Sequence, residues 1–147
     1  MKKIVLATGG FDPVHSGHIA YLMRARELAQ DNGDILVVGV NSDEWLKRKK
    51  GKFFLPFHER CTIIQSIKGV DVVIGFDDAD GTAKDAIAKV RSYYPYGQII
   101  FVNGGDRTKE NIPEMDIVDD NISFVFGIGG DYKMNSSSWI LNNWNSQ

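Results

Sequence analysis

Short apolar runs rich in Val and Ile alternate along the chain with segments whose apolar residues recur three and four positions apart. The continuous runs predict strands of a parallel sheet that is covered on both faces, and the helical spacing predicts helices between them. The expected strands are Ile4–Thr8, Asp34–Val40, Val70–Gly75, Gln98–Val102 and Ile122–Phe126. The expected helices are His18–Gln30, Asp43–Lys49, Pro56–Ile67, Thr82–Tyr93 and Ser136–Asn143.

This order of elements predicts the fold class. Strands that alternate with helices, joined by right-handed crossovers, give an α/β fold with a Rossmann-like, doubly wound, five-stranded parallel sheet. The length of 147 residues suits a single domain over 1–147, and the chain has no repeat or low-complexity linker. Ser42 suits a helix N-cap and Pro56 a first helical position. In such sheets ligands bind beyond the carboxyl ends of the strands, near the switch point of the topology.

Composition narrows the class of protein. The 17 Lys and Arg residues balance 19 Asp and Glu residues, which argues against a nucleic-acid partner. Cys61 is the single cysteine, so an internal disulfide is excluded, and we interpret its thiol as inert. The start of the chain lacks a signal-peptide cleavage region and no apolar stretch approaches eighteen residues, so we expect a cytoplasmic protein without a membrane partner.

The segment between the first strand and the first helix carries the sharpest chemical signal. Gly9 and Gly10 follow the strand, while His15 and His18 lie three residues apart where the helix begins. A helix N-terminus offers backbone N–H groups and a partial positive charge, and residues at this spacing face the same way. With Gly17 leaving room for a ligand, the pattern predicts a nucleotide-phosphate site. Alternatives are a plain glycine turn, or histidines that bind a metal or backbone carbonyls.

A basic segment follows the second strand. Residues 47–52 hold five basic side chains in six positions, and Arg60 lies early in the next helix. Lys47 and Lys50 are candidates to neutralise phosphates as point charges, and Arg60 is a candidate bidentate clamp on phosphate. The alternatives are a solvated charged face and an exposed arginine.

Two later segments complete the candidate site. After the fourth strand the backbone can approach a nucleobase or ribose closely, and a serine-rich start of the last helix can cap that helix and cradle phosphate. These candidates are Asn103, Gly105, Asp106, Ser136, Ser137 and Ser138. We expect Trp139, Ile140 and Trp144 to pack the last helix against the body of the protein rather than bind substrate.

These motifs together resemble the HxGH nucleotidyltransferase superfamily along nearly the whole chain. The chain is most similar to the adenylyltransferase domain that makes ADP-heptose, and only slightly less to glycerol-3-phosphate cytidylyltransferase. The resemblance implies that an acceptor phosphate attacks the α-phosphate of a nucleoside triphosphate and releases pyrophosphate. It also implies that His15 and His18 stabilise the reacting phosphates, and that Gly10 and Phe11 contact the nucleotide through their backbone.

The implied partners are a nucleoside triphosphate and a phosphorylated sugar or polyol, with Mg²⁺ held mainly by the triphosphate and no protein-bound metal. A homodimer is left open. Cytidylyltransferases for glycerol phosphate carry an arginine before the closing hydroxyl run, whereas residues 131–135 contain none, so ATP is favoured over CTP. The alternatives are a glycerol-3-phosphate-type cytidylyltransferase and a non-catalytic nucleotide-binding or sensing module. A nicotinamide-dinucleotide oxidoreductase is disfavoured because the G-x-G-x-x-G pattern is absent.

Overall fold

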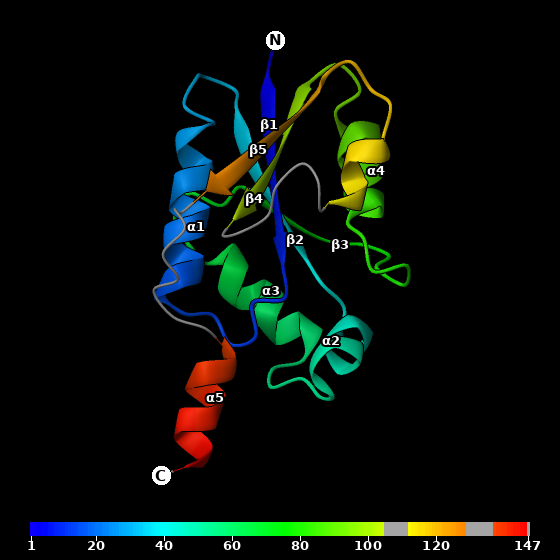
Figure 1. Ribbon diagram of the computed structural model, residues 1–147. Coiled ribbons are helices and arrows are strands. Elements are labelled where there is room, and N and C mark those ends of the chain that lie inside the picture. Colours follow the sequence, from blue (N-terminus) through cyan, green and yellow to red (C-terminus); the bar gives the residue numbers. More distant parts are fainter. Residues whose placement is uncertain (105–111, 129–136, 147) are drawn as a thin grey trace.

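The computed structural model describes residues 1–104, 112–128 and 137–146. Its strands form one parallel sheet in the order β3-β2-β1-β4-β5, which confirms the predicted doubly wound fold (Figure 1). The strands are β1 (Lys3–Gly9), β2 (Ile35–Val40), β3 (Val72–Gly75), β4 (Gln98–Gly104) and β5 (Ile122–Ile128).

The predicted helices are present, with ends that agree with the prediction or differ from it by up to three residues. They are α1 (Ser16–Glu27), α2 (Asp43–Lys50), α3 (Phe57–Gln65), α4 (Lys84–Tyr93) and α5 (Ser137–Asn145). Helix α1 begins earlier than predicted because His15 caps it, and Pro56 is the N-cap of α3 rather than its first residue. Ser42 caps α2 as expected, since its side chain accepts a hydrogen bond from Trp45. A short 3-10 helix, η1 (Pro113–Asp116), was not predicted.

The core has two layers, one on each face of the sheet. On one face α1 and α3 pack against β1 and β2, with Leu22 and Ile64 fully buried. On the other face α4 packs against β1 and β4 through Ile87 and Val90. Figure 1 shows α1 and α4 on opposite sides of the sheet. Strands buried from both sides explain why the apolar runs are continuous rather than alternating.

The strand order places the switch point between β1 and β4. The chain crosses from β1 to β2 over the face that carries α1, and from β3 to β4 over the face that carries α4. The carboxyl ends of β1 and β4 therefore flank the position where ligands bind in this class of sheet. Among the residues that the structure describes, no helix is long and apolar enough to cross a bilayer.

Candidate active site

His15 and His18 meet at the N-terminus of α1. The Nδ1 atom of His15, the N-cap, accepts a hydrogen bond from the backbone N–H of Gly17 at 3.0 Å. The Nδ1 atom of His18 accepts from the backbone N–H of His15 at 3.3 Å, which completes a reciprocal capping box. The two rings stack with their centroids 3.9 Å apart. Both imidazoles thus share one side of the helix start, as their spacing predicts.

These capping bonds fix the position of the imidazole protons. A backbone N–H donates its proton, so Nδ1 of each ring must be the nitrogen with the lone pair. In a neutral imidazole the proton then sits on Nε2, which makes Nε2 the donor. Two Nε2–H donors at the positive end of a helix are suited to anionic oxygens such as those of phosphate.

Phe11 shapes the turn that leads into α1. Its backbone has a φ of 54°, in the left-handed region, which costs a residue with a side chain about 1–2 kcal/mol. The ring is only 2% exposed within the core on the α1 face. It also contacts the His18 ring edge to face, with centroids 5.1 Å apart. Packing of this ring therefore holds the turn and positions the His18 imidazole.

Gly9 and Gly10 lie close to neighbouring side chains. A Cβ atom at Gly9 would lie 3.0 Å from the Phe11 ring, and one at Gly10 would lie 3.0 Å from Leu46 and 3.2 Å from Trp45. Protein side chains therefore occupy the space beside these two glycines. A contact of the nucleotide with the backbone atoms of Gly10 stays a prediction.

Asp12 is a buried residue that was not among the expected site residues. Its carboxylate accepts hydrogen bonds from the backbone N–H groups of Phe54 at 2.6 Å and Leu55 at 2.7 Å. The Lys50 ammonium donates to the Asp12 carbonyl oxygen at 3.3 Å. Asp12 thus ties the turn before α1 to the end of the basic segment. The sequence feature that could have indicated this role is the position of Asp12 between Phe11 and Pro13, just beyond the end of a strand.

Arg60 requires a correction. We expected a clamp on phosphate, but its side chain has 0% exposure. Its Nε donates to the carbonyl of Leu55 at 2.9 Å, and Nη1 donates to the carbonyls of Gly10 at 2.8 Å and Asn41 at 2.7 Å. Nη2 pairs with the Asp43 carboxylate at 2.7 Å. The guanidinium joins the ends of β1 and β2 to α3, so it supports the site from inside the protein.

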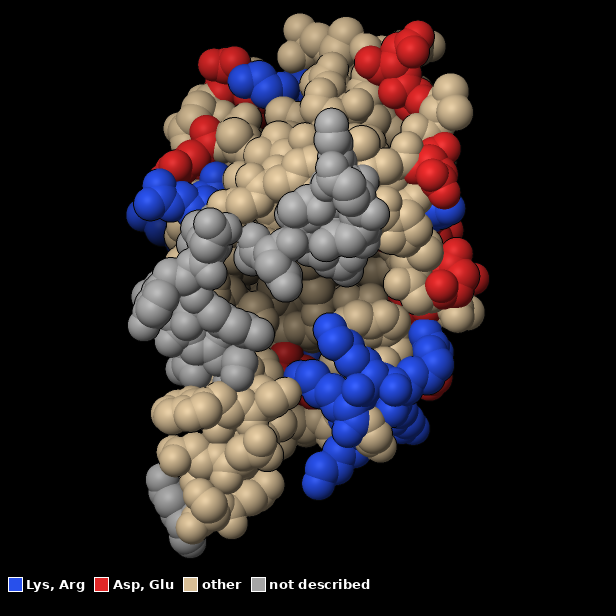
Figure 2. Space-filling view, viewed as in Figure 1, with Lys and Arg blue, Asp and Glu red and all other residues tan. Residues whose placement is uncertain are grey.

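The basic segment lies at the carboxyl edge of the sheet, where α2 follows β2. Its Lys and Arg side chains are exposed, and Figure 2 shows them gathered over α2 beside a hollow in the surface. The Lys47 ammonium lies 5.4 Å from the centroid of the Phe53 ring, and Arg48 donates to the Asp78 carbonyl at 2.7 Å. The predicted location of this charge is therefore confirmed, while contact of Lys47 and Lys50 with phosphate stays a prediction.

Asp78 anchors the start of α2. Its carboxylate accepts from Asn41 Nδ2 at 3.0 Å, from the Ser42 backbone N–H at 2.8 Å and from the Ser42 hydroxyl at 2.7 Å. Burial raises the pKa of this carboxyl, but the hydrogen bonds from Ser42 and Asn41 and the charge of Arg48 outweigh it. They hold the pKa of Asp78 below its ordinary value of 3.8.

We expect Asp78 to link stability to pH. Because its pKa is lower in the folded than in the unfolded chain, its contribution to the free energy of unfolding is present above pH 3.8 and is lost as the pH falls through the folded pKa. Urea unfolding from neutral pH to about pH 3 should show a shallower pH dependence for Asp78→Asn than for the parent. Glu27→Gln is the matched control, since Glu27 is an exposed partner of Arg24. Identical curves for the two variants would contradict this role of Asp78.

The start of α5 meets the histidine turn. Ser137, the first residue of α5, donates its hydroxyl to the Pro13 carbonyl at 2.8 Å, two residues before His15. The structure thus brings one of the three expected serines to the turn, whereas Ser138 is exposed. The other candidates Gly105, Asp106 and Ser136 lie outside the described residues.

The expectation that Trp139 and Trp144 pack α5 against the body is wrong. Their exposed fractions are 61% and 72%. Helix α5 extends beyond the end of the sheet (Figure 1), so these two side chains meet solvent rather than the core.

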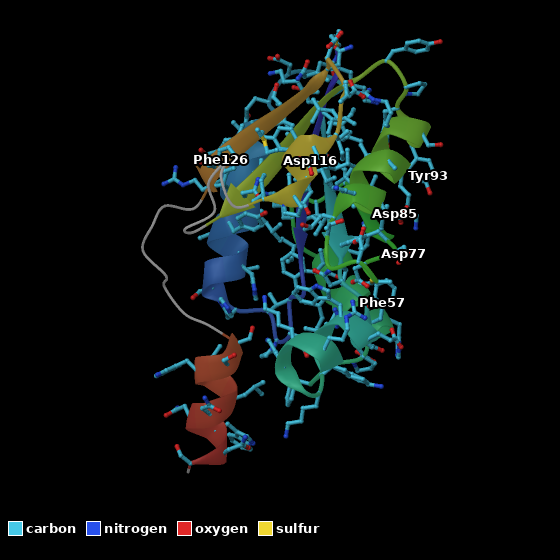
Figure 3. The ribbon with its side chains drawn as sticks, turned by 45° about the vertical axis from the view of Figure 1, so that its right-hand side comes forward. Phe57, Asp77, Asp85, Tyr93, Asp116 and Phe126 are labelled. Carbon is cyan, nitrogen blue, oxygen red and sulfur yellow. The ribbon has the colours of Figure 1, made fainter. Side chains whose placement is uncertain are left out.

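A pocket of about 420 Å³ between α3 and β3 is separate from this site, because it is lined by none of the candidate residues. Its lining includes Cys61 and Phe57, and Figure 3 shows Phe57 at the start of α3, below Asp77 and Asp85. Burial raises the pKa of the Cys61 thiol against the opposing charge of Arg60, so the thiol stays protonated at neutral pH. This agrees with an inert cysteine.

Two buried carboxylates among the described residues, those of Asp12 and Asp78, are engaged in protein contacts. Asp12 and Asp78 accept backbone and side-chain donors, as described above. Within the described part of the chain, no group of three or more His, Cys, Asp or Glu residues could hold a metal ion.

Comparison with known sequences identifies relatives of the chain. The cytidylyltransferase-like family matches residues 6–139. The bifunctional protein HldE of Campylobacter concisus is 37% identical over 131 residues, which cover 86% of this chain and 25% of that protein. HldE of Nitratiruptor is 37% identical over 130 residues, with 86% and 26% covered. The chain thus spans about a quarter of the length of the curated relatives it matches.

Solved structures share the fold. The lipopolysaccharide core biosynthesis protein from Thermoplasma volcanium is 27% identical with a TM-score of 0.62, over 92% of this chain and 100% of that one. A putative nicotinate-nucleotide adenylyltransferase from Vibrio parahaemolyticus has a TM-score of 0.65 over 99% of this chain and 88% of that one. At 18% identity the latter likeness concerns the fold alone.

Proposed function

The chain belongs to the cytidylyltransferase-like family of nucleotidyltransferases, and we propose that it transfers a nucleotidyl group from ATP or CTP to a phosphorylated sugar or polyol. An oxygen of the acceptor phosphate forms a bond to the α-phosphorus, the bond from that phosphorus to the β-phosphate bridging oxygen breaks, and pyrophosphate leaves. The carrying observation is the stacked pair His15 and His18 at the N-terminus of α1, whose Nδ1 atoms accept the two capping bonds.

The chemistry suits such a site. A phosphate monoester is already a nucleophile at neutral pH, so the protein's task is to align the reactants and stabilise charge on the α-phosphate. The two imidazoles and the N-terminal end of α1 would provide hydrogen bonds and positive potential where that charge grows. Removing one such donor typically lowers the rate by about 10²–10³-fold.

The remaining charge on the triphosphate needs cations. We assign Lys47 and Lys50 to the β- and γ-phosphates, because both lie on α2 after the carboxyl end of β2 and Lys50 contacts the Asp12 carbonyl in the turn before α1. A magnesium ion bound to the triphosphate would supply further neutralisation. The residues present fit an ion that the substrate carries, since the carboxylates of Asp12 and Asp78 are occupied by protein donors.

ATP is favoured over CTP because residues 131–135 lack the arginine that the glycerol-phosphate cytidylyltransferases carry. Similarity to HldE also supports ATP as the nucleotide, although the chain covers only 25% of that protein. A glycerol-3-phosphate-type cytidylyltransferase and a non-catalytic nucleotide-binding module are the competing functions.

A screen for pyrophosphate release tests the proposal. Four nucleoside triphosphates are combined with a panel of phosphorylated sugars and polyols, and the active acceptor is then used in competition between ATP and CTP. We expect ATP to be used at least as well as CTP. The competition can resolve the two nucleotides clearly, because a site built to hydrogen-bond one base can reject the other by about 10⁴-fold. A strong preference for CTP would reverse the ranking. Nucleotide binding without pyrophosphate release from any acceptor would favour the non-catalytic module.

A further inference from the structure

Asn103 lies at the carboxyl end of β4 with its side chain on the α4 face of the sheet. Ile99 and Phe101 of the same strand pack in the core beneath α4, and alternate residues of a strand face the same side. Gly104 faces the other way, because a Cβ atom there would lie 3.1 Å from the Tyr21 ring of α1. Asn103 therefore stands at the switch point, on the face opposite α1.

The amide of Asn103 has an unexplained donor. The residue is 8% exposed, and among the described residues its Nδ2 is a buried side-chain nitrogen without a hydrogen-bond partner. Leaving such a donor unpaired destabilises the folded protein, because the buried N–H has lost its hydrogen bonds to water. Asn41, at the end of β2, shows the contrast, because its Nδ2 donates to Asp78 at 3.0 Å. The hydrogen bond to Asp78 explains why an amide stands at position 41, and no such bond explains the amide at position 103.

Thr8 adds a second polar group beside this amide. The pairing of β1 with β4 ends at Leu6 and Phe101, and Thr8 and Asn103 each lie two residues beyond that last pair on their own strands. Thr8 faces the α4 side, because a Cβ atom at Gly39 would meet both the Thr8 side chain and the Phe76 ring of the core beneath α4. The α4 side of the switch point thus presents a hydroxyl and an amide.

The histidines lie on the other side of the same edge. His18 contacts the ring of Phe11, which belongs to the core on the α1 face. In phosphoryl-type transfer the attacking and leaving oxygens lie roughly in line on opposite sides of phosphorus. If the leaving pyrophosphate lies against the N-terminus of α1, this in-line arrangement places the attacking oxygen of the acceptor toward the α4 side.

We propose that Asn103 Nδ2 binds an oxygen of the phosphorylated acceptor, so that Asn103 belongs to the acceptor subsite rather than the nucleobase site expected from the sequence. This inference rests on the proposed function. A neutral amide donates a directional hydrogen bond without adding charge, which suits recognition of an oxygen of a sugar or polyol phosphate. Nδ2 is covered by protein atoms in this structure, so its contact with the acceptor requires a local rearrangement at the end of β4.

Kinetics provide the first test. With the acceptor found active in the pyrophosphate screen, Asn103→Asp and Asn103→Leu should raise the KM for the acceptor by about 10- to 100-fold. The KM for ATP should change by less than about 2-fold, and Asn103→Leu should unfold at no lower urea concentration than the parent. Asn121→Asp, at an exposed position before β5, is the matched control. An unchanged KM for the acceptor, or a rise confined to the KM for ATP, would overturn the proposal.

Nuclear magnetic resonance separates this inference from the proposed function. Nitrogen-15-labelled protein is titrated with ATP alone, and then with glycerol 3-phosphate or glucose 1-phosphate in the presence of ATP. ATP alone should shift the backbone amide of Gly17, and an acceptor should then shift the side-chain amide pair of Asn103, identified by its loss in Asn103→Asp. No shift at Gly17 would reject the proposed function and this inference with it. A shift at Gly17 without a response of Asn103 to either acceptor would overturn this inference alone.

Discussion

Replacing His18 by asparagine is expected to lower turnover by about 10²–10³-fold while changing nucleotide affinity much less. The capping bonds assign the Nδ1 atom of His18 to the backbone N–H of His15 and leave the proton on Nε2. Asparagine places an acceptor near Nδ1 but has no donor at the reach of Nε2. The variant therefore preserves the start of α1 and removes the donor proposed for the α-phosphate. Single-turnover rates and calorimetric binding of ATP would measure the two effects separately.

Two further variants separate chemistry from folding. His18→Gln extends a donor toward the Nε2 position but loses the cap, which typically costs about 1 kcal/mol of stability. It should retain more activity than His18→Asn and unfold more easily. His58→Ala is the control for general loss of a histidine, because the His58 side chain is 79% exposed on α3. Parent-like turnover of correctly folded His18→Asn would remove His18 from the proposed mechanism.

The order of the elements could be predicted from the sequence because each strand of this sheet is buried on both faces. Burial of this kind produces continuous runs such as Ile4–Thr8, and the crossovers then follow from handedness. The meeting of His15 and His18 was also predictable, since it depends only on spacing at one helix start. Signals within about four residues of one another are therefore well represented in the sequence.

Contacts between distant segments were not predictable in this way. Arg60 is bonded to the Gly10 carbonyl across 50 residues of sequence, and nothing near Arg60 distinguishes a buried arginine from an exposed one. The same holds for Asp12, whose carboxylate binds backbone N–H groups 42 and 43 residues later. For Trp139 and Trp144 the apolar side chains suggested burial, but α5 lies beyond the sheet that would have covered them.

Replacing Arg60 by glutamine is expected to destabilise the protein by about 3–5 kcal/mol, the usual cost of breaking a buried ion pair by removing one partner. The side chain is fully buried, and its loss leaves the carbonyls of Gly10, Asn41 and Leu55 and the carboxylate of Asp43 without this donor. Glutamine has two N–H groups on one nitrogen and cannot reach acceptors on several segments at once. The midpoint of urea unfolding, at an unchanged slope, would measure the effect.

Arg24→Gln is the matched control for Arg60→Gln. Arg24 is 64% exposed on α1 and pairs with Glu27, which is 60% exposed, so its loss should change the free energy of unfolding by less than about 1 kcal/mol. Binding of ATP, measured at a temperature where both variants are folded, distinguishes the two roles considered for Arg60. If Arg60 supports the site from inside the protein, Arg60→Gln should lose much stability, and ATP binding should weaken only because the fold is less stable. Parent-like stability combined with a specific loss of triphosphate affinity would instead restore the phosphate clamp, because only a guanidinium that touches the ligand could act on binding without acting on the fold.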